Sequence, residues 1–588
     1  MSYTPIVSNR MRLSLRLLLA LLAPGSAALA QAQAPAPPGT AGSWAVDELK
    51  AGQEGTVWTV FQGTKPEAFK VVVSGIVRNA LGPGKSLILC QLTDPRVLQM
   101  GAVAGMSGSP LYIDGRFAGA LSYQVTQFES TPFAGFTPAA DLAEVGDRVN
   151  AAADAPAGEV ASAPGYRQLR PVFTLSGLSP TVADLMQPFF TKLGLATASL
   201  GGGSAGSAPD APAAPLRPGD AVSVALATGD ITLAGTGTVT EVDGNRIIAF
   251  GHPMMSLGET DLPMCSAEIV TIIPSAQESI KVANTGPIIG TITQDRLSAV
   301  SGLVGRQPDL IEVEVAVHSA HPQTLRFRVA REEQLTPAII AAGVTQAIVG
   351  SNEAGLSNGF RITSDLVFAP GQTLDSHALY AGPHAFAAGL SDFVQDLSQD
   401  LENPYQKTFP SRVAFSIEAL ARNPAVTLDQ FRLSRATARA GETIQAQLAW
   451  RDFQGADHVE VVPIPIDPAW AGKTLEVVLG PGAALDELTG RPRVLAAAQL
   501  RSFEAYLAAM RDDRPTDGVC LAVVEGAALF TDQTDSTPEL PGSLARIAAA
   551  ADEARFQEHP AYVSLWERDL LPGKLFGTMV RRPLQISN

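Results

Sequence analysis

Short runs of apolar residues, separated by glycine, proline and polar residues, recur along most of the chain. Apolar runs of this length that are bounded by turn residues are typical of β-strands. In the first half of the chain they predict strands at residues 57–61, 69–77, 86–92, 220–226, 234–242 and 247–250. Asp-Gly at residues 243–244 is a hairpin turn signal, so we expect the last two of these strands to pair.

The second half of the chain mixes strand and helix patterns. Alternation of apolar and polar residues at 311–317 and 325–329 predicts two half-buried strands. Helices are expected within 337–350 and 386–402, which makes this part of the chain a mixed α/β segment. A clean alternating run at 440–450 then favours a carboxy-terminal β-sandwich with a helix after it. The predicted fold class is therefore mainly β.

Breaks in composition divide the chain into several segments. We expect a signal peptide (1–30), an Ala/Pro linker (31–43), a first β-rich half (44–150), a linker with a short helix (151–215), a second β-rich half (216–310), an α/β segment (311–410) and a carboxy-terminal β-sandwich-like domain with a helix (411–588). At 588 residues the chain is too long for a single hydrophobic core, which agrees with several domains.

The amino terminus has the pattern of a secretory signal. Three arginines precede a short leucine- and alanine-rich run at 17–23, and Ala-Leu-Ala at 28–30 is a small-x-small cleavage site. The alternative is an uncleaved membrane anchor, but the apolar run is shorter than the roughly 20 residues that a spanning helix needs. No later segment is apolar enough to span a bilayer. We therefore expect an exported protein, periplasmic or extracellular, with no transmembrane segment after cleavage.

Charge and composition exclude several kinds of partner and cofactor. The formal net charge is −16 and no basic patch stands out, so neither nucleic acid nor an anionic lipid surface is an expected partner. The phosphate-binding pattern Gly-x-x-x-x-Gly-Lys is absent, and no His/Cys/carboxylate cluster has zinc-ligand spacing. We therefore expect no cofactor and no metal. Three cysteines in an exported protein leave at least one thiol unpaired, and Cys90 is predicted to be a small buried strand residue.

One stretch carries a candidate nucleophile. Gly-Met-Ser-Gly-Ser-Pro at residues 105–110 precedes a predicted strand, a tight turn and a second strand. A serine between two glycines on such a bend can expose its hydroxyl, and neighbouring backbone N–H groups can converge on one point. Glycine and serine are also the commonest turn residues, so local composition alone favours a plain loop.

The wider sequence resembles the SpoIVB-type serine peptidases, the family of the sporulation stage IV B signalling protease. The resemblance rests on Thr-Asp-Pro-Arg-Val-Leu at 93–98, on the serine stretch at 105–110 and on Asp-Gly-Arg-Phe-Ala-Gly-Ala at 114–120. A second block at 235–252 contains a Gly-Thr-x-Thr strand, a hairpin and Phe-Gly-His. In the family the histidine block precedes the serine block, whereas here the order is reversed.

The resemblance implies a chymotrypsin-like double β-barrel assembled from these two blocks, with a catalytic triad between them. Ser107 would be the nucleophile, His252 the general base and Asp94 the acid that orients the imidazole. The backbone N–H groups of Gly105 and Ser107 would form the oxyanion hole. Asp94 also lies on a turn signal of its own, and Asp261 is a rival for the orienting role. Chain order is no obstacle, because triads are defined by geometry.

The resemblance also implies a protein or peptide substrate, with the chain itself among the candidates. Phe133, Gly135 and Phe136 lie in a segment similar to the one where the family pairs substrate as an added strand; the alternative is an ordinary edge strand. Two functions stay open. One is an exported serine endopeptidase of narrow specificity, and the other is a catalytically inactive cell-envelope scaffold that keeps the peptidase fold for binding. The sequence predicts neither the substrate nor the oligomeric state.

Overall fold

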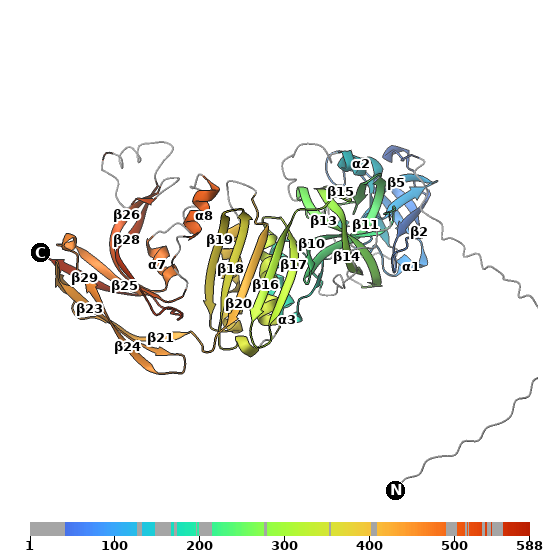
Figure 1. The fold of residues 1–588 in the computed structure, drawn as a ribbon. Coiled ribbons are helices and arrows are strands. Elements are labelled where there is room, and N and C mark those ends of the chain that lie inside the picture. The colour runs from blue at the N-terminus through green and yellow to red at the C-terminus, as the bar shows by residue number, and fades with distance from the viewer. Residues whose placement is uncertain are drawn as a thin grey trace, which may run out of the picture. The chain divides into compact units, whose positions relative to one another are not determined.

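The computed structural model describes most of the chain after residue 41. The described residues are 42–125, 132–147, 166–169, 173–195, 197–198, 215–275, 279–351, 354–401, 408–489, 502–511, 514, 517–531, 536–537, 543 and 557–588. The predicted signal peptide at 1–30 and most of the Ala/Pro linker lie outside them. Figure 1 labels the helices and strands.

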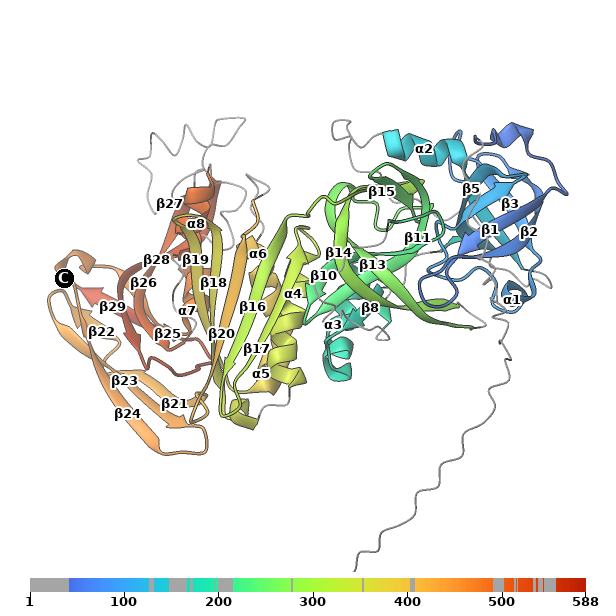
Figure 2. The same cartoon turned by 45° about the vertical axis from the view of Figure 1, so that its right-hand side comes forward.

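The first group of strands forms a closed antiparallel barrel, drawn in blue in Figure 2. Its strands are β1 (Glu54–Thr59), β2 (Glu67–Val77), β3 (Leu87–Leu92), β4 (Pro110–Ile113), β5 (Arg116–Val125) and β6 (Phe133–Pro138). Around the ring, β1 pairs with β2, β2 with β3, β3 with β6, β6 with β5, β5 with β4, and β4 with β1. Outside the ring, β7 (Tyr166–Gln168) pairs with β5, and the short helix α1 (Pro95–Leu98) follows β3.

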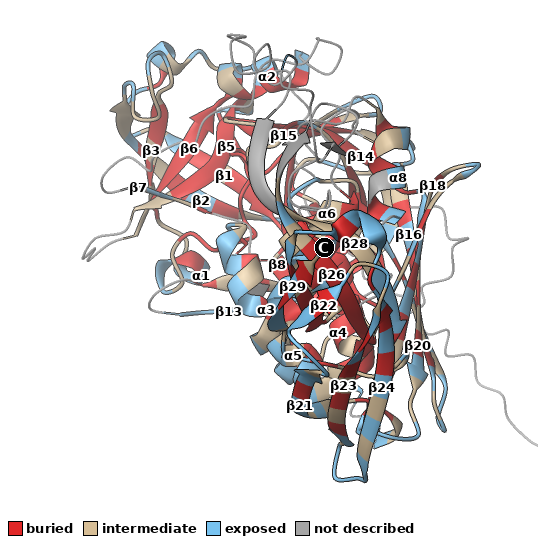
Figure 3. Cartoon of the chain, turned by 90° about the vertical axis from the view of Figure 1, so that its left-hand side faces the viewer, coloured by how far each residue is buried: buried red, intermediate tan, exposed pale blue. Residues whose placement is uncertain are grey.

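Alternating apolar side chains fill this barrel. Phe69, Val71 and Val73 of β2 are buried in one cluster with Ile88 and Cys90 of β3. A spacing of two residues places them on the same face of each strand, and each large side chain contributes about 1.5–3 kcal/mol when it leaves water. Burial also raises the pKa of the Cys90 thiol well above its usual range. Figure 3 colours β1 and β5 largely as buried.

A second closed antiparallel barrel follows. Its strands are β10 (Ala221–Gly229), β11 (Thr232–Asp243), β12 (Arg246–Ala249), β13 (Gly258–Ile273), β14 (Ile280–Arg296) and β15 (Ala299–Val304). The ring runs β10–β11–β12–β15–β14–β13 and closes from β13 onto β10. The predicted hairpin is present, because Asp243 pairs with Arg246 across the turn between β11 and β12. Two short strands, β8 (Phe173–Ser176) and β9 (Thr197–Ala198), continue this sheet beyond β11.

A small apolar cluster joins the two barrels. Leu142 and Val145 of helix α2 (Ala139–Asp147) pack in it with Trp58 of β1 and Ile248 of β12. The helix contacts β5 and β6 of the first barrel and β12 and β15 of the second. This shared core holds the serine-bearing and histidine-bearing halves together.

The α/β segment continues the second barrel through a strand pairing between β10 and β17. Its sheet has the order β19 (Gln372–Tyr380), β18 (Phe360–Ala369), β20 (Arg412–Ala419), β16 (Leu310–His318) and β17 (Gln323–Ala330). Its apolar core includes side chains of the helices α3 (Pro180–Lys192), α4 (Thr336–Thr345), α5 (Pro383–Ala388) and α6 (Leu390–Leu401). Helix α4 is buried along its whole length and continues as a π-helical turn over Gln346–Gly350.

The carboxy-terminal part consists of two sheets around one core. The smaller sheet has the order β21 (Val426–Leu433), β23 (Thr443–Asp452) and β24 (Asp457–Pro465). The larger contains β22 (Thr437–Arg439), β29 (Val580–Ser587), β25 (Thr474–Gly480), β26 (Val519–Thr531), β27 (Ser536–Thr537) and β28 (Gln557–Leu570). Leu448 and Ile464 of the first sheet share a buried cluster with Val477 and Leu521 of the second. Helix α7 (Gly482–Thr489) packs on β26 and β28 of this part, whereas α8 (Phe503–Arg511) packs on β19 and shares the apolar core of the α/β segment.

The predicted fold class is confirmed: a chymotrypsin-like pair of β-barrels precedes a mixed α/β segment and a sandwich-like carboxy-terminal part. A helix is predicted after the alternating run at 440–450, and the structure describes α8 in that part of the sequence. Within the described residues no helix is both long and apolar enough to cross a membrane.

Candidate active site

The serine stretch forms a tight loop between α1 and β4 of the first barrel. Gly105 and Gly108 have φ angles of 97° and 91°, a conformation that side chains disfavour. The hydroxyl of Ser109 donates a hydrogen bond to the carbonyl oxygen of Met106 at 2.6 Å, and the Met106 side chain is fully buried. Met106 and Ser109 therefore fix the loop from within, and Ser107 lies between them.

The loop lies against β11 of the second barrel. The backbone N–H of Thr238 donates to the carbonyl oxygen of Ser107 at 2.8 Å. The Thr238 hydroxyl donates to the carbonyl oxygen of Gly105 at 3.2 Å, and the Thr240 hydroxyl donates to that of Gly108 at 2.7 Å. These three hydrogen bonds from Thr238 and Thr240 of β11 thus hold the serine loop against the second barrel.

The turn that carries His252 meets the same strand. The backbone N–H of Phe250 donates to the carbonyl oxygen of Thr238 at 3.2 Å. Phe250 and Gly251 have φ angles of 68° and 69°, so the chain turns sharply just before the histidine. Thr238 therefore contacts Ser107 through its N–H and Phe250 through its carbonyl oxygen. The structure brings the two predicted blocks together across the barrels.

Both predicted catalytic side chains are buried at this junction. Ser107 and His252 are each 0 % exposed. The Ser107 hydroxyl has no hydrogen-bond partner among the described residues, so no hydrogen bond joins it to the imidazole in this structure. A buried hydroxyl without a partner is energetically costly, and Ser107 shares this property with other buried hydroxyls, among them those of Thr285 and Ser564.

The imidazole of His252 contacts a backbone carbonyl oxygen and a side-chain amide. Its Nδ1 atom lies 2.7 Å from the carbonyl oxygen of Pro253 and 2.9 Å from Nε2 of Gln168. The same Gln168 amide donates to the Pro253 carbonyl oxygen at 2.9 Å. Gln168 is placed there because β7 pairs with β5, with Gln168 opposite Tyr123. The ring also packs edge-to-face on Phe250, with centroids 6.2 Å apart.

The backbone N–H groups of the serine loop divide into two sets. Those of Met106, Gly108 and Ser109 donate to carbonyl oxygens of the first barrel. Those of Gly105 and Ser107 donate to no group within the part of the chain that the structure describes. They are the two N–H groups that the resemblance assigns to the oxyanion hole, and they are available for an external acceptor.

The structure does not bring Asp94 to the histidine. Asp94 caps α1, and its carboxylate accepts hydrogen bonds from the backbone N–H and the guanidinium of Arg96 at 3.0–3.1 Å. The side-chain hydrogen bond from Arg96 holds the pKa of Asp94 below its ordinary value. The rival Asp261 instead accepts from Arg306 at 3.0 Å. Neither carboxylate hydrogen-bonds to His252 in this structure, and the orienting role of Asp94, with Asp261 as its rival, stays a prediction.

A different carboxylate organises the histidine turn. Asp295 of β14 is 1 % exposed, and it accepts backbone N–H bonds from Met254 at 2.7 Å, Met255 at 2.8 Å and Leu257 at 3.1 Å. Burial raises the pKa of this carboxyl, while the backbone donors favour its ionised form. Asp295 thus fixes the chain from two residues beyond His252 onward.

Replacing Asp295 by asparagine is expected to lower the free energy of unfolding by about 1–3 kcal/mol, because the new amide NH2 faces backbone donors that need an acceptor. Urea denaturation of both proteins measures the difference. Asp261→Asn is the matched control, since Asp261 also accepts a backbone N–H but its side chain is 30 % exposed. Equal losses in the two variants would contradict the special role of Asp295.

The structure places Phe133, Gly135 and Phe136, which are predicted to lie where a substrate strand pairs, within the first barrel. These residues lie in β6, which pairs with β3 on one side and with β5 on the other. Both hydrogen-bonding edges of β6 are therefore occupied within the barrel, and Phe136 is fully buried. A peptide cannot add to this strand unless the barrel opens.

Sequence reasoning missed three residues that shape the site. Gln168 lies in a segment whose composition predicts a linker. The sequence around Thr238 predicts a strand and does not by itself predict a role in the site. Asp295 stands beside a glutamine and an arginine and resembles an ordinary hairpin tip. The Gly-Thr-x-Thr strand was the one usable signal, because it contains Thr238.

No thiol or metal site competes with the serine as a reactive centre in the described part of the chain. Cys90, Cys265 and Cys520 are all free and buried. Burial raises the pKa values of Cys265 and Cys520 to about 12, so their thiols are unreactive at neutral pH. Among the described residues there is no group of three or more His, Cys, Asp or Glu that could hold a metal ion.

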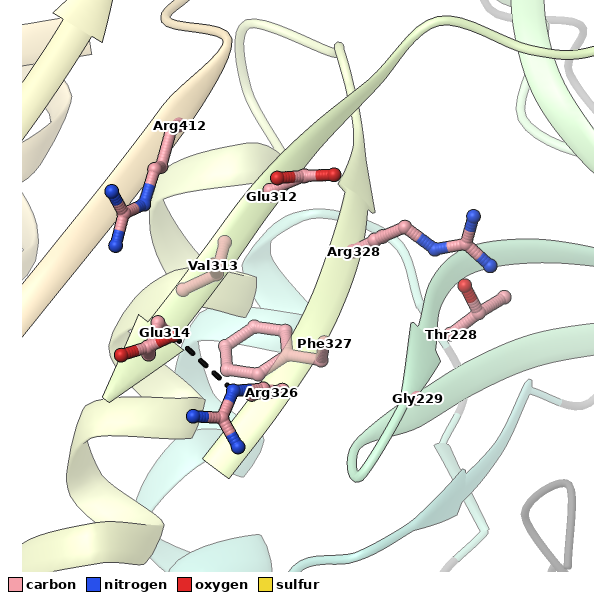
Figure 4. Close-up of a pocket in the computed structure, with 9 residues that line it drawn as sticks. All are labelled: Thr228, Gly229, Glu312, Val313, Glu314, Arg326, Phe327, Arg328 and Arg412. Atoms are coloured by element: carbon pink, nitrogen blue, oxygen red, sulfur yellow. Dashed lines mark hydrogen bonds and ion pairs between the residues drawn. The ribbon is translucent and has the colours of Figure 1, made fainter. Parts of the chain in front are cut away.

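A separate pocket of about 420 Å³ lies over β16, β17 and the end of β10 (Figure 4). Its charged side chains are cross-strand neighbours of opposite sign. Glu314 lies opposite Arg326 and forms an ion pair at 3.2 Å, and Glu312 lies opposite both Arg328 and Arg412. Such pairing stabilises a sheet surface, and none of the predicted catalytic residues lines the pocket.

The fold and the junction together define a chymotrypsin-like class of protein, with a serine loop on one barrel and a histidine turn on the other. Residues 41–137 match the model of the SpoIVB peptidase S55 family. This match confirms the resemblance over residues 41–137, which at family level are similar to the SpoIVB-like peptidases. The match covers the first barrel with Ser107 and ends before the barrel that carries His252. No curated protein and no solved structure matches the chain.

Proposed function

We propose that the protein is an exported serine endopeptidase in which Ser107 is the nucleophile and His252 the general base. The observation that carries the proposal is the position of Thr238, which hydrogen-bonds to Ser107 and to Phe250 and so holds the serine loop against the histidine turn. The family match supports a peptidase. Export rests on the signal pattern at residues 1–30.

The reaction would follow the acyl-enzyme route. The Ser107 oxygen attacks the carbonyl carbon of the scissile peptide bond, and Nε2 of His252 takes the hydroxyl proton. The oxyanion that forms accepts hydrogen bonds from the N–H groups of Gly105 and Ser107. His252 then gives its proton to the leaving amine, and water hydrolyses the acyl-enzyme by the same steps in reverse order.

The contacts of Nδ1 suit this role in one tautomer. When Nδ1–H donates to the Pro253 carbonyl oxygen, Nε2 carries the lone pair that a general base needs. The Gln168 amide nitrogen, which is itself a donor, then bonds to the same carbonyl oxygen and not to Nδ1. The buried Asp295 would supply negative charge to the turn when the imidazolium forms.

The burial of both side chains limits access. A substrate reaches Ser107 only after covering groups move aside, so this structure corresponds to a closed form. A protein substrate with a flexible segment fits this constraint better than a rigid surface would.

The test is hydrolysis, including self-cleavage, by the purified full chain and its Ser107→Ala variant. Ser107→Ala is expected to reduce cleavage by about 10⁴-fold or more, because the nucleophile is lost. Ser357→Ala is the control, since this exposed serine lies in the α/β segment and outside the serine loop, and it should retain cleavage. Unchanged cleavage by Ser107→Ala would contradict the proposal.

A non-catalytic scaffold is the second candidate. The observation that favours it is the complete burial of Ser107 and His252 without a hydrogen bond between them. This alternative predicts no cleavage by any form of the protein and no reaction of Ser107 with a serine-directed reagent.

A further inference from the structure

Lys281 is a buried amine beside the serine loop. It lies near the start of β14 and is 3 % exposed. Its Nζ atom donates a hydrogen bond to the Thr59 hydroxyl at 2.7 Å, the single side-chain hydrogen bond that it makes within the described residues. Thr59 ends β1 of the other barrel and is itself fully buried. The lysine therefore reaches from the second barrel into the first.

The backbone and the stem of Lys281 contact the loop directly. The backbone N–H of Lys281 donates to the carbonyl oxygen of Ala104 at 2.9 Å. The backbone N–H of Ala104 donates to the carbonyl oxygen of Ser279, also at 2.9 Å. The methylene stem packs against Gly105: a Cβ atom built on Gly105 would lie 3.2 Å from Cδ and 3.3 Å from Cγ of Lys281. The position of Gly105, and of its N–H, thus depends on where this stem lies.

No described charged group compensates the amine. β1 presents Thr59, the loop presents Ala104 and Gly105, and β13 places Ile272 opposite Lys281. Burial alone lowers the pKa of the lysine to about 7. A protonated Nζ would have three N–H donors and one acceptor, and two unsatisfied donors on a buried charge are strongly unfavourable.

We propose that Lys281 is a positioning residue for the serine loop, and that it fixes Gly105 only while its amine is neutral. Protonation drives the ammonium toward water, which displaces the stem from Gly105 and withdraws one donor of the oxyanion hole. The inference rests on the proposed function, because the Gly105 N–H matters for rate only if Ser107 is the nucleophile. It adds a second proton-sensitive group to that site besides His252.

The loop movement can be measured without any activity. Met106 lies in the loop, and its ¹³C-labelled methyl group, assigned with a Met106→Leu sample, reports on loop position. The measurement uses the full chain with His252→Gln, so that the imidazole does not titrate. We expect the Met106 resonance to shift with a midpoint near pH 7, and we expect Lys281→Met to abolish this step.

The effect on rate is read from the pH dependence of Ser107 labelling by a fluorophosphonate. Labelling requires both His252 and Lys281 to be neutral. On the acid side, log10 of the labelling rate should therefore fall by almost two for each pH unit. In Lys281→Met, which keeps the apolar stem, the slope should be one. If Lys281→Met fails to fold, Thr59→Val serves instead, because loss of the acceptor moves the lysine step to lower pH and also reduces the slope.

The outcomes separate the two ideas. A Met106 resonance that does not titrate, or an acid slope that is the same in the parent and Lys281→Met, would overturn the positioning role. Absence of Ser107 labelling at every pH in every form would reject the proposed function, while the Met106 step would still show whether Lys281 controls the loop.

Discussion

Replacing His252 by alanine is expected to slow the labelling of Ser107 by a fluorophosphonate by about 10³-fold or more. The Ser107 hydroxyl is a weak nucleophile at neutral pH, and a general base supplies most of its activation. The fluorophosphonate assay can be done without knowing the natural substrate. Opening of the buried site precedes the chemistry in both proteins, so it cancels in the ratio of the two rates.

His384→Ala is the control for this comparison. His384 is an exposed residue of α5, in the α/β segment, and its loss should leave the labelling rate within about twofold of the parent. Matching urea denaturation curves for the parent and His252→Ala would show that the variant is folded. Equal labelling of the parent and a folded His252→Ala would remove His252 from the mechanism.

Replacing Gly108 by alanine is expected to be the most disruptive single change in the serine loop. A Cβ atom on Gly108 would overlap the carbonyl oxygen of Thr238 and the backbone nitrogen of Phe250, and would lie 2.9 Å from the Phe250 Cα. All three atoms belong to the backbone, so no side-chain rotation relieves the clash. We expect a loss of about 3–5 kcal/mol in the free energy of unfolding and loss of Ser107 labelling.

Gly101→Ala is the matched control. Gly101 also has a positive φ angle, 65°, but a Cβ atom there meets no other atom within 4 Å. Its substitution should therefore cost only the backbone strain, about 1–2 kcal/mol, and should leave labelling intact. Similar losses in the two variants, measured by urea denaturation, would mean that the contact between the loop and the histidine turn is not what makes Gly108 necessary.

Local patterns in the sequence were sufficient to predict the barrels. The runs at 57–61, 69–77 and 86–92 became β1, β2 and β3, because apolar residues bounded by turns have little alternative to a strand. The Asp-Gly hairpin and the Gly-x-Ser-Gly loop were predictable for the same reason. Each of these features depends on neighbours within a few residues.

The features that the sequence does not predict depend on distant partners. Whether β6 is an edge strand is decided by its pairing with β3 and β5, not by its own composition. Asp94 has the expected sequence context, but Arg96 two residues later captures its carboxylate. The role of Asp295 follows from its burial beside a turn that lies about 40 residues earlier in the chain. A single sequence carries no local signal for such contacts.

The central claim is that the serine loop and the histidine turn form one catalytic site between the barrels. A crystal structure of the full chain after reaction with a fluorophosphonate tests it most directly. The account predicts a covalent bond from phosphorus to the Ser107 oxygen and a phosphoryl oxygen about 2.7–3.1 Å from the backbone nitrogens of Gly105 and Ser107, with the His252 ring adjacent to the adduct. Modification of another residue, or an adduct on Ser107 that turns away from both N–H groups and from His252, would contradict it.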